Sequence, residues 1–239
     1  VLPGLQAGVR RQAPEEEDQR REPHHAALPV LAADTCGLKL DLVIVDDASR
    51  DNSLQKAQAL SDGYANITVL KHDTNRGKGA AMRTGFENAK GDIVIVQDAD
   101  LEYDPGDYPK LLKPIIDAQA DVVYGSRFSG GDSHRVLYFW HSIGNRFLTL
   151  LSNMMTDLNL TDMETCYKLM RADVARSLDI QSRTFTVEPE MTAKFARAKL
   201  RVVEVPISYD SRGYDEGKKI GLKDAFLAIG AILRFRFFA

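Results

Sequence analysis

The chain has few cysteines and no long apolar run. Its two cysteines, Cys36 and Cys166, lie too far apart for a metal-binding pair of the usual spacing, and they form no disulfide framework. We therefore expect a reducing compartment. The longest apolar candidate, Ala225–Leu233, is about half as long as a membrane-spanning helix. The N-terminus carries charges where a signal peptide needs its apolar centre, which predicts a cytoplasmic protein.

An excess of basic residues is also missing. The 31 lysines and arginines are outnumbered by 34 acidic residues, and the net charge is -3. Without a global positive field, the composition argues against nucleic acid as a partner. The 239 residues, 44% of them hydrophobic, are enough to bury the core of one large α/β domain.

The chain divides near residue 38. Residues 1–38 include Gln12–His25, a segment of dense mixed charge with two prolines, which is typical of loop or disorder. Only Ala27–Ala33 is apolar there. The regular pattern begins after this segment, so residues 39–239 are predicted to form the folded domain.

Strand-like and helix-like segments alternate through the first half of this domain. The predicted strands are Leu40–Asp47, Ile67–His72, Asp92–Asp100 and Asp121–Phe128. The predicted helices are Asn52–Leu60, a helix that follows the glycine-rich turn and runs to about Ala89, and Asp107–Ala118. Alternation of this kind indicates an α/β fold with an open, mostly parallel sheet and crossover helices.

The second half is less regular. It predicts a long amphipathic helix over Val136–Met155, strands at Thr165–Arg171 and Leu200–Tyr209, and a helix at Val187–Lys199 between them. An amphipathic helix, Gly221–Phe237, closes the chain.

Acidic side chains follow two of the predicted strands. Asp46 and Asp47 end the first strand, and Asp98, Asp100 and Glu102 follow a later one. Ligands bind beyond the carboxyl ends of the strands in open parallel sheets. Hard oxygen ligands there suit Mg²⁺ or Mn²⁺ with a diphosphate. A D-x-D pattern alone is also common in solvated acidic loops.

The wider set of motifs is more specific. The segments "VDDASRDNS", "NRGKGAAMRTGFENAKGD" and "QDADLEYDP" occur in this order, and together they resemble the family 2 glycosyltransferases of the GT-A fold. The later segments "GSRF", "FWHSIGN", "LTDMETCYKLM", "FTVEPEMTAK", "EVPISY" and "RGYDEGKKIGLKDAF" look like the polyprenyl-phosphate branch, which includes dolichyl-phosphate glucosyl- and mannosyltransferases. The resemblance covers about Leu40 to Phe235.

The resemblance implies an inverting, metal-dependent transfer of a hexose from a nucleotide sugar to a polyprenyl phosphate at the cytoplasmic face of a membrane. The donor would be UDP-glucose or GDP-mannose, with a mild preference for UDP-glucose. The implied nucleotide-binding residues are Asp46, Asp47, Lys78, Gly79 and Asp98. The implied ligands of Mg²⁺ or Mn²⁺ are Asp100 and Glu102.

Asp162 matches the carboxylate region usually assigned as catalytic base, and Glu164 is the second choice. A lipid monophosphate has a second pKa near 6, so its oxygen is already largely ionised at neutral pH. Asp162 is therefore also interpreted as a residue that orients the acceptor. Two anions that meet need cations, and arginines bind phosphate in a bidentate manner. The candidates are Arg127, Arg135 and Arg212; without the resemblance each would be taken for a surface arginine.

The two amphipathic helices allow two interpretations. Phe139, Trp140, Ile143, Phe147, Leu150 and Leu151 form a broad apolar face on the first. Basic residues flank the second: Lys218, Lys219, Lys223, Arg234 and Arg236. Such faces pack into a core or lie on an anionic membrane surface. The sequence leaves both alternatives open.

The N-terminus departs from the family pattern. Relatives begin with a strand that ends in a Pro-x-x-Asn-Glu type of turn and helps to bind the nucleotide. Nothing similar precedes Leu40. We therefore expect the first position of the sheet to be unfilled and the base pocket to be incomplete.

Two further functions stay open at this point. One is transfer of the sugar to a protein or polysaccharide acceptor. The other is a non-catalytic protein of the same fold that binds membranes or partners.

Overall fold

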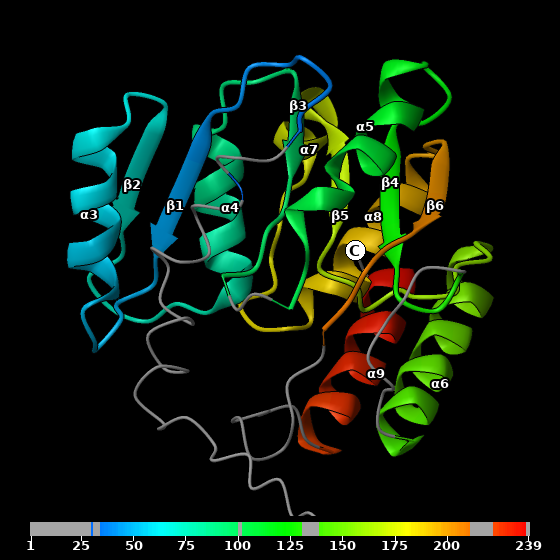
Figure 1. The fold of residues 1–239 in the computed structure, drawn as a ribbon. Coiled ribbons are helices and arrows are strands. Elements are labelled where there is room, and N and C mark those ends of the chain that lie inside the picture. The colour runs from blue at the N-terminus through cyan, green and yellow to red at the C-terminus, as the bar shows by residue number, and fades with distance from the viewer. Residues whose placement is uncertain (1–29, 31–33, 100–101, 131–138, 211–221, 238–239) are drawn as a thin grey trace, which may run out of the picture.

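The computed structural model describes residue 30 and residues 34–99, 102–130, 139–210 and 222–237. The strands are β1 (Leu42–Asp46), β2 (Ile67–Lys71), β3 (Ile93–Ile95), β4 (Val122–Ser126), β5 (Lys168–Arg171) and β6 (Val202–Pro206). The helices are α3 (Ser53–Gly63), α4 (Lys78–Asn88), α5 (Tyr108–Ile116), α6 (Phe139–Thr156), α7 (Ala172–Ser177), α8 (Val187–Arg197) and α9 (Leu222–Phe237), with a 3₁₀ turn η1 at Pro105–Asp107. This alternation is the predicted α/β architecture (Figure 1).

The strands form two sheets where the sequence predicts one. β1 pairs with β2 in parallel, and the second sheet has the order β3-β5-β4-β6. β4 and β6 are parallel, whereas β5 runs antiparallel to both β3 and β4. β3, β4 and β6 therefore share one direction, and β5 is the antiparallel strand of this sheet, within the predicted mostly parallel architecture. The sequence of β5, KLMR, has two apolar residues between two basic ones, and so short a segment carries no information on the direction of the strand.

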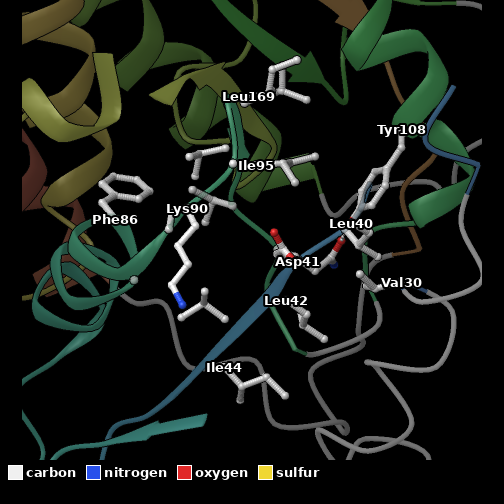
Figure 2. Close-up of a pocket in the computed structure, with 18 of the residues that line it drawn as sticks. Val30, Leu40, Asp41, Leu42, Ile44, Phe86, Lys90, Ile95, Tyr108 and Leu169 are labelled. Atoms are coloured by element: carbon white, nitrogen blue, oxygen red, sulfur yellow. Dashed lines mark hydrogen bonds between the residues drawn. The ribbon is translucent and has the colours of Figure 1, made fainter. Parts of the chain in front are cut away.

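A cavity separates the two sheets. It has a volume of about 660 Å³ and is lined along its length by residues of β1 and β3. Figure 2 shows Asp41 and Leu42 on one side of it, Ile95 on the other, and Phe86 and Tyr108 from two helices. The described residues thus place no strand between β1 and β3.

The main core lies around β4 and β5. Val122, Val123 and Tyr124 of β4 are fully buried, as are Met191 and Phe195 of α8. Because β4 is covered on both faces, its sequence is a continuous apolar run without alternation. Helix α8 packs against α6 and α9, which lie side by side below the carboxyl end of the sheet (Figure 1).

The predicted elements are present, with shifted ends. β3 has only 3 residues, since the chain leaves the ladder before Gln97. Helix α5 contains Pro114 in its interior and ends two residues later. Helix α7 is missing from the sequence prediction, because 6 residues are too few to show a helical period.

Candidate active site

The candidate site lies at the carboxyl ends of β1 and β3. Asp46 and Asp47 follow β1, Asp98 follows β3, and the glycine-rich turn before α4 lies between them. Two contacts bring these segments together. The amide N–H of Gly77 donates to Asp47 Oδ2 at 2.7 Å, and Lys78 Nζ lies 3.1 Å from Asp98 Oδ2. Residues from three sequence segments therefore share one edge of the fold.

Asp47 is the centre of a hydrogen-bonded turn. Besides Gly77, its carboxylate accepts from the amide of Arg76 at 2.9 Å and contacts His72 Nδ1 at 2.6 Å. The other ring nitrogen of His72 bonds to Thr84 Oγ1 of α4 at 2.9 Å. Partial burial opposes the charge of Asp47, but these hydrogen bonds lower the pKa of its carboxyl below the usual value. The Asp47 carboxylate thus fixes the glycine-rich turn to the end of β1, while neighbouring Asp46 is buried and accepts from Ser49 N at 3.2 Å.

Two glycines let this turn approach another backbone. A Cβ at Gly77 would lie 2.1 Å from the carbonyl oxygen of Arg183, and φ is +88° there. A Cβ at Gly79 would lie equally close, 2.1 Å, to the carbonyl oxygen of Ser182. The Gly79 amide donates to Arg183 O at 3.0 Å. Any larger residue at either position would push the turn away from the segment before α8.

Lys78 connects the two carboxylates behind the turn. Its ammonium lies 3.1 Å from Asp98 Oδ2 and 3.2 Å from Glu188 Oε1 of α8. Burial opposes the charge on Lys78, yet Asp98 and Glu188 raise the pKa of Lys78 well above its usual value. For Asp98, burial is likewise outweighed by Lys78, and the pKa of Asp98 is lowered. The pair is therefore ionised at neutral pH.

A buried charge cluster lies deeper. Lys168 of β5 is completely buried and forms an ion pair with Glu188 Oε2, and it also donates to the carbonyls of Met163 and Thr165. Nearby Glu164 has an Oε1 atom that is shielded from solvent and has no hydrogen-bond partner among the described residues. Burial and the neighbouring Glu188 carboxylate raise the pKa of Glu164 to about 7. Glu164 therefore takes up or releases a proton near neutral pH.

Arg127 and Asp162 form a two-pronged ion pair. Arg127 Nε donates to Asp162 Oδ2 and Nη2 to Oδ1, both at 2.7 Å, and the Arg127 amide adds a third bond at 3.1 Å. Asn145 of α6 donates to Asp162 Oδ1 at 3.1 Å. Burial works against the charge on Asp162, but Arg127 lowers the pKa of Asp162. A fully bonded carboxylate with a lowered pKa is a weak base, so this geometry suits positioning of Arg127 better than proton abstraction.

The predicted metal-binding segment is described only in part. Glu102 accepts a hydrogen bond from the Tyr209 hydroxyl at 2.9 Å. Asp100 lies outside the described residues, as do Arg135 and Arg212. Within the described ranges, no cluster of three His, Cys, Asp or Glu side chains could hold a metal ion. The carboxylates of Asp98 and Glu102 are nevertheless hard oxygen donors of the kind that Mg²⁺ and Mn²⁺ prefer.

The sequence interpretation missed four residues that hold the site in place: His72, Asn145, Lys168 and Glu188. Asn145, Lys168 and Glu188 lie inside the quoted motifs, where they stand among other polar residues and nothing in the local pattern singles them out. His72 ends a predicted strand and gives no local sign of its partner, since Asp47 lies 25 positions away.

The apolar face of α6 is largely exposed. Trp140 is 77% exposed and Phe139, Ile143, Phe147 and Leu150 are also exposed, whereas Leu151 packs against the core. On neighbouring α9, Phe226 is 73% exposed and Phe237 is also exposed. None of the described helices is long and apolar enough to cross a membrane. The interpretation of these faces as core is therefore wrong for the exposed residues.

Comparison with known proteins identifies the family. Residues 30–179 match the family model Glycosyl transferase family 2. The chain is 33% identical over 193 residues to an undecaprenyl-phosphate mannosyltransferase of Micrococcus luteus, covering 76% of each chain. It is 29% identical over 187 residues to a dolichol-phosphate mannosyltransferase of Pyrococcus furiosus, covering 77% of this chain but only 52% of that one. The chain thus spans about half of the archaeal relative.

The fold matches solved structures as well. A crystal structure of glucosyl-3-phosphoglycerate synthase from Mycobacterium tuberculosis, in complex with Mn²⁺, UDP and glucosyl-3-phosphoglycerate, superimposes with a TM-score of 0.65. The match covers 90% of this chain and 74% of that one at 19% identity, and it supports the GT-A fold. By sequence, this chain belongs to glycosyl transferase family 2, in the polyprenyl-phosphate branch.

Proposed function

We propose that this protein transfers a hexose from a nucleotide sugar to a polyprenyl phosphate at a membrane surface, with inversion at the sugar carbon. One observation carries the proposal: the glycine-rich turn, fixed by Asp47, meets Asp98 and Lys78 at the carboxyl edge of the fold. This is where open α/β sheets bind ligands. The names of the relatives support the substrate class.

The donor would lie along this edge. Asp46 and Asp47 would face the base or ribose, and the turn at Lys78 and Gly79 would lie beside the diphosphate. Lys78 is already neutralised by Asp98 and Glu188. We therefore propose that it fixes Asp98 in place for the donor and adds little free positive charge of its own.

The leaving diphosphate needs further positive charge. Asp100 and Glu102 would hold Mg²⁺ or Mn²⁺, which when bound would neutralise the diphosphate. Arg127 would supply a guanidinium on the acceptor side. Asp162 accepts from its Nε and Nη2, and we propose that other N–H groups of the guanidinium, which has five in all, bind the phosphate. Arg135 and Arg212 would add to this role.

The base is the least demanding part of this reaction. A lipid phosphate is already ionised at neutral pH, so no side chain has to remove its proton. We propose that Asp162 holds Arg127 in position. Glu164 stays the second candidate for proton transfer, because its pKa lies near neutrality and its Oε1 is unpaired among the described residues. A hydroxyl acceptor, in a protein or polysaccharide, would need such a base.

The exposed face of α6 and α9 would approach the lipid. Trp140 and Phe226 are large apolar side chains exposed to water, and Arg234 and Arg236 are exposed near the end of α9. Aromatic and basic groups on one face suit an anionic membrane surface. The polyprenyl phosphate would then reach the site without leaving the bilayer surface, which we place at the cytoplasmic face.

Two nucleotide sugars are candidates for the donor, UDP-glucose and GDP-mannose. The motifs "LTDMETCYK" and "EGKKIGLKDAF" favour UDP-glucose. The two relatives named as mannosyltransferases favour GDP-mannose. Calorimetric titration with UDP and GDP, each with and without Mn²⁺, separates them. Metal-dependent binding of one nucleotide supports the proposal and selects the base, whereas a folded protein that binds neither would support the non-catalytic alternative.

A vesicle assay tests the acceptor side. We expect Trp140→Ser to weaken binding to anionic lipid vesicles by roughly ten- to a hundredfold, because a buried aromatic side chain contributes about 1.5 to 3 kcal/mol. Tyr64→Ser, an exposed residue just after α3, is the matched control and should bind as wild type does. Equal binding by all three proteins would contradict the membrane surface and favour a soluble acceptor.

A further inference from the structure

The acceptor side of the candidate site holds an arginine that is already paired. Arg127 donates two hydrogen bonds of 2.7 Å to Asp162, so the charges of the two side chains largely cancel. A phosphate monoester carries close to two negative charges at neutral pH. A site for such a group therefore needs a further cation that no carboxylate neutralises.

Arg146 of α6 is a second cation on this side. Its Cζ lies 5.9 Å from the centre of the Phe128 ring, and Arg127 Cζ lies 5.8 Å from the centre of the same ring. Both distances are within the range of a cation–π interaction. The half-buried Phe128 is held in turn by its amide, which donates to Ser126 Oγ at 3.0 Å. One aromatic side chain thus keeps two guanidinium groups near each other.

Helix α6 is fixed to the site at this point (Figure 1). Asn145, the residue before Arg146, donates to Asp162 Oδ1 at 3.1 Å. One turn further on, Thr149 Oγ1 accepts from the amide of Met163 at 3.1 Å. Both bonds join α6 to the segment that carries Asp162, so the backbone of Arg146 has a fixed place beside the buried ion pair.

Arg146 also lies at the border of the exposed apolar face of α6. Residues three and four positions apart are neighbours on a helix surface. The exposed Ile143 and Leu150 are such neighbours on one side of Arg146, and the buried Thr149 is the neighbour on the other. Arg146 itself is exposed. Its alkyl stem can lie along an apolar surface while its charged head stays in a polar one.

The protein does not neutralise the charge of Arg146. No carboxylate among the described residues pairs with it, whereas Arg127, Arg171 and Arg201 are each paired with an aspartate. A guanidinium carries five N–H donors in a planar fork that matches two phosphate oxygens. Arg146 therefore combines free donors with a place between the apolar face and the Arg127 side of the site.

We propose that Arg146 is a phosphate-binding residue at the lipid entrance of the site, where its guanidinium receives the phosphate monoester of the polyprenyl acceptor and holds it together with Arg127. This inference rests on the proposed function and specifies its acceptor side. An anionic phospholipid also carries a phosphate, but as a diester with one negative charge. The two sources are therefore separable by experiment.

The test is binding of the full chain to lipid vesicles in the absence of nucleotide. The vesicles are phosphatidylcholine alone, phosphatidylcholine with polyprenyl phosphate, and phosphatidylcholine with phosphatidylglycerol at the same total charge. We expect wild type to prefer the polyprenyl phosphate vesicles and Arg146→Gln to lose this preference. Affinity for these vesicles should fall roughly ten- to a hundredfold, the value of one hydrogen bond between charged groups. Arg146→Lys, which keeps the charge but not the fork, should lie between them.

Two further variants are controls. Arg197 is an exposed arginine at the end of α8, where the chain approaches the amino end of β6, away from the carboxyl ends of the strands. Arg197→Gln removes the same charge and should retain the preference. Trp140→Ser should weaken binding to all three compositions by the same factor, because it removes an apolar contact. Arg146→Gln should unfold in urea as wild type does, since its side chain is exposed.

Steady-state kinetics locate the effect within the reaction. Arg146→Gln should raise the KM for polyprenyl phosphate by a factor similar to the loss of vesicle affinity. The KM for the nucleotide sugar should stay unchanged, because the donor would lie at the ends of β1 and β3 and not beside α6. A change in the donor KM alone would contradict the assignment of Arg146 to the acceptor.

The vesicle results separate the possible failures. If Arg146→Gln keeps the preference of wild type, Arg146 does not bind the acceptor, and the proposed function stands without it. If binding to polyprenyl phosphate and phosphatidylglycerol vesicles falls equally, Arg146 is a general membrane contact and the proposal is overturned. If wild type itself shows no preference for polyprenyl phosphate, the acceptor of the proposed function is contradicted, and this inference is contradicted with it.

Discussion

The two layers of the candidate site are held by different forces. At the surface edge, the Asp47 carboxylate is fixed mainly by backbone N–H groups and by His72. Behind it, Lys168 and Glu188 are paired side-chain charges with almost no exposure. A carboxylate that accepts backbone hydrogen bonds near water loses little when one bond is removed. A buried ion that loses its partner keeps the full desolvation cost. Mutations at the surface edge should therefore mainly weaken nucleotide binding, whereas mutations in the buried layer should mainly lower the free energy of unfolding.

The largest effect is expected in the buried layer. Lys168→Met leaves the Glu188 carboxylate without its closest cation and should lower the free energy of unfolding by about 3 to 5 kcal/mol. Urea unfolding at pH 7 measures it. Lys113→Met, which breaks an exposed pair with Asp117, is the control and should change stability by less than about 1 kcal/mol. The double variant Lys168→Met, Glu188→Met should recover much of the loss, because no buried charge is then left alone. A single variant as stable as the control would contradict this comparison.

This buried layer marks the limit of the sequence interpretation. The order of strands and helices followed from apolar periodicity, and the acids after β1 and β3 followed from the rule that ligand sites lie at strand ends. The partners of the buried charged side chains could not be predicted from these rules. Lys168 meets Glu188 across 20 positions and His72 meets Asp47 across 25, and local patterns carry no information on such pairings. The antiparallel direction of β5 did not follow either, since direction depends on the path of the chain between strands.

The Arg127–Asp162 pair tests whether a buried ion pair of the site serves the reaction more than the stability of the fold. Arg127→Lys keeps the positive charge but loses the fork that bonds both oxygens of Asp162, so positioning should suffer more than stability. We expect kcat to fall by about a hundredfold, which is typical of losing one donor to a developing charge. Arg201→Lys, at an exposed two-pronged pair with Asp121, is the matched control and should retain activity. Activity unchanged in both variants would exclude Arg127 from the reaction.

A mutation at the surface edge of the site should change the affinity for the nucleotide. Asp47→Asn removes the charge that accepts from Arg76 and Gly77, and nucleotide affinity should fall about tenfold, the value of one or two weakened hydrogen bonds. Calorimetric titration measures it, with Asp51→Asn, further along the same loop, as control. The pKa of Asp47 is lowered in the folded protein, so its stabilisation is present above its unfolded value of 3.8 and disappears as the pH falls through the folded pKa. The difference in unfolding free energy between wild type and Asp47→Asn should therefore vanish only in strong acid. A difference that vanished near neutral pH would mean that the turn is not held by the ionised carboxylate.

Glu164 should show a pH dependence of stability opposite to that of Asp47. Its pKa rises from 4.5 to about 7 on folding, so the folded state binds a proton that the unfolded state releases. Its stabilisation is complete below pH 4.5 and is lost as the pH rises through about 7. Glu164→Gln mimics the protonated form, so relative to this variant the wild type should lose about 2 to 3 kcal/mol between pH 5 and pH 8. Urea unfolding across that range measures the loss, and Glu87→Gln on the exposed face of α4 should run parallel to wild type. Parallel curves for Glu164→Gln would mean that its carboxylate is solvated in the folded protein, and its place as second candidate for proton transfer would then lose its physical basis.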